Sequence, residues 1–309
     1  MMAPTSRAPA ASTPWFLAMV AASLLVHASG VPLASPGVTI TACVAILVFG
    51  LPHGTLDLQL IARTRAARTM TMTQIASIYL VLAGLSLAIW MIDPVLALAM
   101  FLAVATAHFS EDWSPGGPSF LAHGMALAIL AAPTLLWRDE VSALFVAVAG
   151  DATARWLADI LLAIAPVSLL VAAVALGAAW MEGRRSDALC GAATLAAMII
   201  LPPAFAFALF FCLFHSPRHF TEALRELSWN RSDRWSRVVV PLTTVGLVLA
   251  MMIGLSAARQ DASSQIAAAS FVTLAVLTIP HMLTPLIVAA WINGAKAPPL
   301  CPATPIAPT

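Results

Sequence analysis

Long apolar runs recur along almost the whole chain and constrain its fold more than any other feature. They occur at about 15–34, 37–53, 74–92, 94–109, 120–137, 156–180, 188–201, 203–219, 238–256 and 266–292. A membrane-spanning helix needs roughly 20 apolar residues. The composition agrees, with 61% hydrophobic residues, 9% charged residues and a mean hydropathy of +0.93. The sequence therefore predicts an all-α, polytopic integral membrane helix bundle of about eight to ten transmembrane helices.

The two ends of the chain differ in composition from its centre. Residues 1–14 are rich in Pro, Ala and Ser and are predicted to form a disordered N-terminal tail. Residues 15–292 are predicted to form a single transmembrane helical domain, followed by a Pro/Ala-rich C-terminal tail at 293–309. The first run also has the pattern of a signal peptide, but we interpret it as an uncleaved helix because membrane segments follow it. Pro202-Pro203 predicts two short helices or one broken helix.

The distribution of positive charge predicts an orientation. In a ten-span topology with the N-terminus inside, only Arg138, Arg155 and Arg259 of the 15 Lys and Arg residues lie in outer loops. This bias predicts a multi-pass protein of the cell inner (plasma) membrane with both termini in the cytoplasm. The formal net charge of +1, without basic runs interleaved with aromatic residues, gives no indication of nucleic-acid binding.

Five of the seven histidines fall near one membrane face in this topology: His53, His108, His123, His215 and His219. Ionisable groups at such depth are rare and usually functional. Because helix ends on one side of a bundle can converge, they can supply the ligands of one metal ion. His215 and His219 are four residues apart in LFHSPRHF, so both imidazoles project from one helix face. Pro217 between them is expected to bend the helix.

Carboxylates follow these histidines closely: Asp57 after His53, Glu111 and Asp112 after His108, and Glu222 after His219. A carboxylate that accepts the far ring N–H of a ligand histidine fixes its orientation, and we expect Asp57 and Asp112 to do this for His53 and His108. Imidazole suits iron, copper, zinc or nickel, and the lack of nearby thiolates disfavours a structural zinc site. Four histidines around Fe(II) would leave positions free for O₂.

A single histidine at a helix end often contacts only a headgroup or a backbone carbonyl. We favour this interpretation for His27 and His123. An HxxxH pair alone is also only a moderate signal for a metal. The metal interpretation gains its weight from His53 and His108, which add two further histidines with acids behind them at the same membrane face.

Four short motifs resemble one known family. GLPHGTLD, AHFSEDW, FHSPRH and IPHMLTP occur in this order between residues 50 and 285. They are similar to motifs of the Brp/Blh family, bacterial and archaeal membrane β-carotene 15,15′-dioxygenases that make retinal for rhodopsins. The resemblance implies iron-dependent cleavage of the central double bond of β-carotene by O₂ to give two retinal molecules. It also implies four metal-binding, catalytic histidines, which fall on His53, His108, His215 and His219. His281 matches the last motif, and we expect it to contact a ligand or the substrate channel rather than the metal.

The substrate implied by the resemblance offers almost no hydrogen-bonding groups, so specificity must come from the shape of an apolar tunnel. The phenylalanines before the HxxxH pair could line it, although simple lipid contact is the favoured interpretation for most of them: Phe205, Phe207, Phe210, Phe211 and Phe214. The implied partners are β-carotene, O₂, the lipid bilayer and a retinal-binding rhodopsin.

Other functions remain open from the residues alone. A different non-haem iron membrane oxygenase acting on a lipid would use the same ligands. A histidine-using transporter of metal ions or protons predicts polar groups throughout the membrane thickness, whereas here they gather near one face. A retinal-binding photoreceptor is excluded, because the only lysine, Lys296, lies beyond the last apolar run.

Overall fold

The regular elements are all helices in the part of the chain that the computed structural model describes, residues 13–63, 70–114, 119–229, 234–256 and 261–295. Their order is α1 (Thr13–Ala28), α2 (Pro36–Gly54), α3 (Asp57–Arg63), α4 (Met72–Ile92), α5 (Pro94–Ser110), η2 (Glu111–Trp113), α6 (Phe120–Ala131), α7 (Thr134–Ala149), η3 (Ala152–Ala154), α8 (Arg155–Met181), α9 (Arg185–Ile200), α10 (Pro203–Phe210), η4 (Phe211–His215), α11 (Ser216–Glu226), α12 (Arg234–Ser256) and α13 (Ala262–Ala295). The predicted all-α class is confirmed. Most of the two predicted tails lies outside these residues.

Six helical segments of the described chain are long and apolar enough to cross a membrane: Pro36–Arg63, Met72–Ile92, Pro94–Trp113, Ala152–Met181, Trp235–Ser256 and Ala262–Ala290. The protein is therefore a multi-pass membrane protein. The bent pair α6 and α7 raises this number to seven if the two form one span. The expected number was higher because it included runs that fold as short helices. The helices α1 and α9 have 16 residues each, below the roughly 20 that a bilayer requires.

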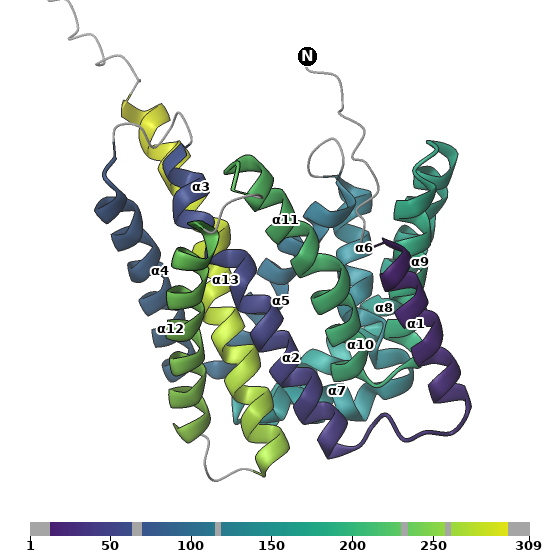
Figure 1. Cartoon of the computed structure of the whole chain (residues 1–309). Helices are drawn as coiled ribbons and strands as arrows, with labels where there is room; N and C mark the ends of the chain where they lie inside the picture. Colours follow the sequence, from purple (N-terminus) through teal and green to yellow (C-terminus); the bar gives the residue numbers. More distant parts are fainter. Residues whose placement is uncertain (1–12, 64–69, 115–118, 230–233, 257–260, 296–309) are drawn as a thin grey trace, which may run out of the picture.

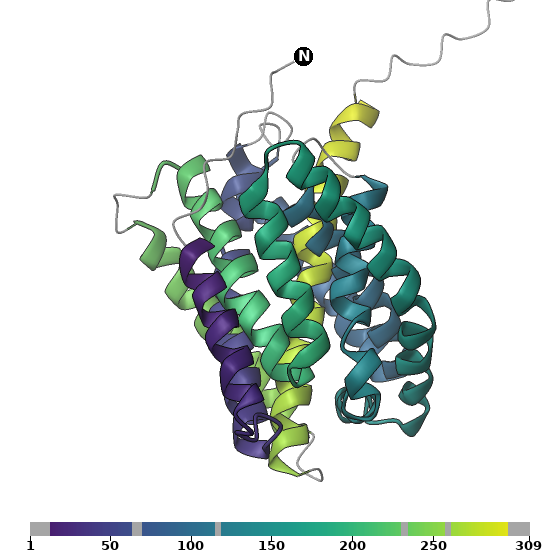
Figure 2. The same ribbon diagram turned by 90° about the vertical axis from the view of Figure 1, so that its right-hand side faces the viewer.

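The helices pack as two groups joined by a central layer. On one side α13 packs against α2, α4 and α12, and on the other α8 packs against α6, α7 and α9. Figure 1 shows α3, α4, α12 and α13 at the left, α1, α8 and α9 at the right, and α2, α10 and α11 between them. Seen from the side, the axes of the long helices are roughly aligned (Figure 2). This arrangement brings the ends of α2, α5, η4 and α11 to one end of the bundle.

Prolines interrupt two of the predicted runs. The run expected at 120–137 is not one straight helix, because α6 ends at Ala131 and the chain bends by 69° into α7. Pro133 lies at this bend, where its missing N–H cannot continue the helix. The predicted break at Pro202-Pro203 is confirmed, since α9 ends at Ile200 and α10 begins at Pro203.

The chain around the HxxxH pair contains a π-helical turn. Residues Phe211–His215 form this turn, and α11 follows directly with Pro217 in its first turn. A proline ring clashes with the carbonyl four residues earlier, here that of Leu213, and a wider turn relieves the clash. The helix therefore does not stop at Pro217, and His215 lies where a single π turn changes the direction of the side chains.

Candidate metal centre

Histidines from α5, from the continuous segment of η4 and α11, and from α13 meet at one end of the bundle. His108 lies in the last turn of α5, His215 ends η4, His219 lies in α11 and His281 lies in α13. Their ring centroids are close: 4.5 Å for His215–His219, 4.8 Å for His108–His215, 4.8 Å for His108–His281 and 5.4 Å for His108–His219. Three of the four predicted ligands thus lie together, and the HxxxH pair presents both rings to the same point.

The fourth predicted ligand, His53, lies in the last turn of α2, but its side chain is outside the described part of the structure. The backbone beside it does reach the cluster. A methyl group added at Gly54 would lie 3.9 Å from Nδ1 of His281. A hydrogen bond of 2.5 Å from the hydroxyl of Ser216 to the carbonyl of Phe49 also ties the start of α11 to the last turns of α2. Ligation by His53 stays a prediction.

The nitrogens of His108 and His215 face each other in a way that suits a bound cation. The Nδ1–H of His215 donates to Oδ2 of Asp112 at 2.6 Å, and Nδ1 of His108 lies 3.5 Å from Oε2 of Glu111. The neutral imidazole of His215, paired in this way, carries its lone pair on Nε2. The two Nε2 atoms are 3.2 Å apart. At this distance the two nitrogens can share a proton in a hydrogen bond, and a metal ion can take the place of that proton. Metal–nitrogen bonds of about 2.1 Å can reach one common point from both atoms.

Asp112 connects two of the predicted ligands. Its Oδ2 binds His215, and its Oδ1 lies 3.4 Å from Nε2 of His219, with the side chain fully buried. One ligand atom from each of these three residues lies within 4.8 Å of the others, so they can hold a metal ion. The sequence had paired Asp112 with His108. The short η2 turn after α5 directs Asp112 toward η4 and α11 instead, and Glu111 takes the position beside His108.

Asp57 and His281 form a second, partly buried histidine–carboxylate pair. Nδ1–H of His281 donates to Oδ2 of Asp57 at 2.6 Å, and the Asp57 side chain is only 8% exposed. The expected contact of Asp57 with His53 is untested, because the His53 side chain is not described. The position of His281 agrees with the expectation that it contacts a predicted ligand, since its ring packs edge-on against that of His108.

Aromatic rings enclose His215. Phe211 stacks on it with centroids 5.3 Å apart, and Phe109 and Phe210 pack on its other sides at 4.9 Å and 5.8 Å. His215 is completely buried as a result. Phe210, Phe211 and Phe214 are buried too, so lipid contact is excluded for these three. Of the five phenylalanines considered as tunnel walls, Phe207 lines a small apolar cavity of about 80 Å³ beside Phe109.

Two further residues considered in the sequence, Glu222 and His123, differ in their distance from the histidine cluster. Glu222 lies partly exposed on α11, close enough for its charge to act on Glu111. His123 lies outside the cluster, with its Nδ1–H donating to the carbonyl of Ser119 in its own helix. The sequence interpretation gave Glu111 no role of its own. Its spacing of three residues from His108 on one helix would have indicated the contact.

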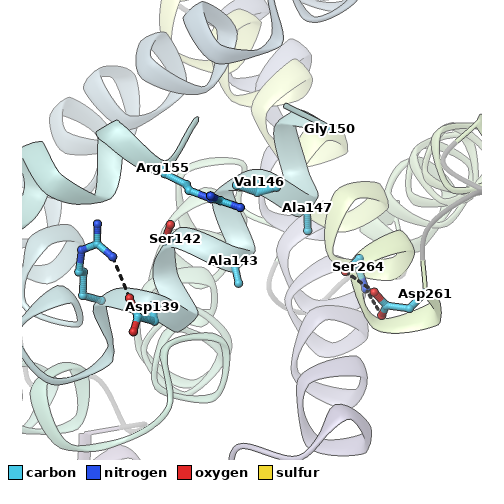
Figure 3. Close-up of a pocket in the computed structure, with 10 residues that line it drawn as sticks. Asp139, Ser142, Ala143, Val146, Ala147, Gly150, Arg155, Asp261 and Ser264 are labelled. Atoms are coloured by element: carbon cyan, nitrogen blue, oxygen red, sulfur yellow. Dashed lines mark hydrogen bonds and ion pairs between the residues drawn. The ribbon is translucent and has the colours of Figure 1, made fainter. Parts of the chain in front are cut away.

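A more polar cavity of about 590 Å³ lies at the opposite end of the bundle, lined by residues of α7, the start of α8 and the start of α13 (Figure 3). Its carboxylates already have structural partners. Asp139 pairs with Arg138 at 2.8 Å. Hydrogen bonds from Ser263 and Ser264 at the start of α13 hold the pKa of Asp261 well below its usual range. The described residues that line this cavity include no histidine or cysteine, so they lack the ligands that the histidine cluster offers.

The fold and the site together define a class: a polytopic helical membrane protein with a buried histidine–carboxylate centre, suited to a metal ion, at one end of the bundle. Comparison with known proteins gives the family. Residues 44–291 match the family described as beta-carotene 15,15'-dioxygenase, and the chain belongs to this family. The matched region contains every residue of the histidine cluster.

Two curated proteins are similar over most of their length. The chain is 30% identical over 258 residues to the beta-carotene 15,15'-dioxygenase of the uncultured marine bacterium 66A03, covering 77% of this chain and 90% of that protein. It is 25% identical over 314 residues to the probable beta-carotene 15,15'-dioxygenase Blh of Halobacterium salinarum, covering 89% and 90% respectively. No solved structure is significantly similar to this chain.

Proposed function

We propose that this protein is a β-carotene 15,15′-dioxygenase that cleaves the central double bond of β-carotene with O₂ and releases two retinal molecules. One observation carries the proposal. Histidines of the family motifs meet around one buried point, inside the region that matches the family. The reaction is balanced without another reductant, because each carbon of the broken double bond receives one oxygen atom of O₂. The apolar helices around the centre suit a hydrocarbon that dissolves in the bilayer.

Fe(II) is the proposed metal, with His53, His108, His215 and His219 as its ligands and as the catalytic residues. Imidazole nitrogen suits iron, and an incompletely filled site suits an oxygenase better than a structural role. The carboxylates of Asp112 and Glu111 would balance the charge of a divalent ion among neutral imidazoles. When bound, iron supplies the activation of O₂ that the side chains cannot perform.

The residues of the chain hold and shield this centre. Asp112 fixes the ring of His215 so that Nε2 points inward, and Asp57 fixes the ring of His281. Phe211 stacks on His215 and Phe109 packs edge-on against it, and together they help to exclude water from this ring. None of the carboxylates is needed as a general acid, because oxygen addition to an alkene begins without proton transfer.

The proposed location is the cell inner membrane, with both termini in the cytoplasm, because of the bias of Arg and Lys toward one set of loops. A retinal-binding rhodopsin in the same bilayer is the proposed recipient of the product. Reporter fusions at each terminus test the orientation. Co-purification with a rhodopsin from the same membrane tests the partner.

The decisive experiment is expression in a bacterium that accumulates β-carotene, followed by chromatography of the extracted pigments. Loss of β-carotene with appearance of retinal supports the proposal, and the His215→Ala variant should leave the pigment intact. Intact β-carotene beside folded, iron-loaded protein would contradict the proposal and favour an oxygenase acting on another lipid. Intact β-carotene with folded protein that binds no metal would contradict it in favour of a transporter.

A further inference from the structure

Another apolar cavity begins at the histidine cluster, away from the small cavity beside Phe109. Its volume is about 310 Å³, near the lower end of the roughly 300–1,000 Å³ range of small-molecule sites. It is lined by residues of α2, α4, α12 and α13, and Figure 1 shows α4, α12 and α13 together at the left of the bundle.

The inner end of this cavity touches the centre. Gly54 and His281 both line it, and the His281 ring lies 4.8 Å from that of His108. Gly54 has no side chain to separate the cavity from the Asp57–His281 pair, and an added methyl group there would lie 3.6 Å from Oδ2 of Asp57. A molecule that fills the cavity therefore ends beside the predicted metal ligands.

The outer end faces the surface of two apolar helices. Leu80 on α4 is 70% exposed and Val245 on α12 is 65% exposed, and both line the cavity. The helices α4 and α12 lie among the six that can cross a membrane, and only 17% of the spanning window of each is buried. In a bilayer this surface contacts lipid tails, so the cavity opens sideways into the membrane rather than toward water.

The polar groups in the wall are already used by the protein. The hydroxyl groups of Tyr79 and Thr278 donate to the carbonyls of Leu277 and Leu274, and that of Thr55 donates to the carbonyl of Pro52. Nδ1 of His281 is bonded to Asp57. A ligand with polar groups would gain few hydrogen bonds in this cavity. An elongated hydrocarbon forms no hydrogen bonds and would lose no binding energy for that reason.

We propose that this cavity is the channel through which the polyene substrate enters from the bilayer, passing between α4 and α12, and that it holds one half of the molecule with the reactive double bond at the histidine centre. This inference rests on the proposed function. It assigns substrate specificity to the residues that line this cavity, from Leu80 at its outer end to His281 at its inner end. The phenylalanines before the HxxxH pair do not set specificity in this proposal.

Ala76 and Ser77 on α4 provide a matched test, because both are small and they are neighbours at the same depth. Ala76 lines the channel, whereas Ser77 does not line it and is exposed on the same helix. Ala76→Phe places a ring in the channel and should weaken β-carotene binding by roughly tenfold or more, with Ala76→Leu giving a smaller loss. Ser77→Phe adds the same ring outside the channel and should bind as the wild type does.

Binding is measured on purified, chelator-treated protein, because protein without iron cannot turn the pigment over. The protein is incubated with β-carotene in detergent and then recaptured on an affinity resin. The readout is the absorbance of the β-carotene that stays bound to it. Thermal denaturation of each variant, and its iron content before the chelator treatment, show whether a loss of binding comes from misfolding. If Ala76→Phe is misfolded, the smaller Ala76→Leu substitution replaces it in the comparison.

The two proposals fail in different ways. Wild-type binding by Ala76→Phe, or an equal loss in Ser77→Phe, overturns the channel, even when the wild-type protein produces retinal. A wild-type protein that retains β-carotene but never produces retinal when iron-loaded overturns the proposed function and leaves the channel supported.

Discussion

The carboxylate of Asp112 should control the metal affinity of the centre. It accepts the Nδ1–H of His215 at 2.6 Å, a short charge-assisted bond inside the bundle, and its other oxygen lies 3.4 Å from Nε2 of His219. A hydrogen bond to a charged group contributes about 1.5–3 kcal/mol. The 3.4 Å contact is too long to add a strong bond. Weakening of this hydrogen bond alone is therefore expected to reduce the free energy of metal binding by at most this amount.

In the Asp112→Asn variant the amide oxygen can still accept the N–H of His215, but as a neutral acceptor of roughly half the strength. The loss of negative charge near a divalent ion adds to this effect. At about 1.4 kcal/mol per factor of ten, the expected weakening of Fe(II) binding is about 10–100-fold, the range typical of carboxylates behind ligand histidines. The affinity is measured under argon by competition with a chelator of known strength.

Asp93→Asn is the matched control. Asp93 lies at the other end of α5 and caps it by accepting the N–H of Leu96 at 2.9 Å, a role that asparagine also fills. It should bind iron within threefold of the wild type. If Asp112→Asn also stays within threefold, the reasoning about the Asp112–His215 pair is wrong. If instead binding disappears altogether in a folded protein, Asp112 is itself a ligand, and the four-histidine assignment needs revision.

Two further substitutions test the ligand set and the packing. His219→Ala should lose bound iron and retinal production, whereas His123→Ala should keep both. Metal analysis of the purified variants measures this, and equal bound iron in the two would refute the ligand assignment. Gly124→Ala should destabilise the protein by about 1–3 kcal/mol, because the added methyl group would overlap the stiff side chain of Val171 where α6 meets α8. Gly84→Ala, with open space around it, should not, and thermal denaturation in detergent that gives equal midpoints would contradict this account.

The helical class and the gathering of histidines followed from the sequence because both depend on local patterns. An apolar run near bilayer length can satisfy its backbone hydrogen bonds only as a helix. Its secondary structure can therefore be predicted without knowing which segments pack against it. The HxxxH spacing likewise fixed which face carries His215 and His219, and the structure places their rings 4.5 Å apart. The described residues contain fewer candidate spans than the expected eight to ten, because run length alone does not show how long the folded helix is: α1 and α9 have only 16 residues each.

The pairing of acids with histidines depended on contacts between distant segments. Asp112 and His215 are 103 positions apart, and Asp57 and His281 are 224 apart, so no local rule joins them. The sequence assigned each acid to the nearest preceding histidine, and the η2 turn reversed this assignment for Asp112 by directing it toward η4.

The sequence by itself determined that this protein is a helical membrane bundle with a histidine-rich end, because hydrophobicity and helical spacing act within single segments. Only the tertiary structure decided which carboxylate holds which imidazole, that His281 joins the cluster, and that an apolar cavity between α4 and α12 leads to it. These features arise where helices far apart in the chain are packed against each other, and the packing energy is shared among residues that no local pattern connects.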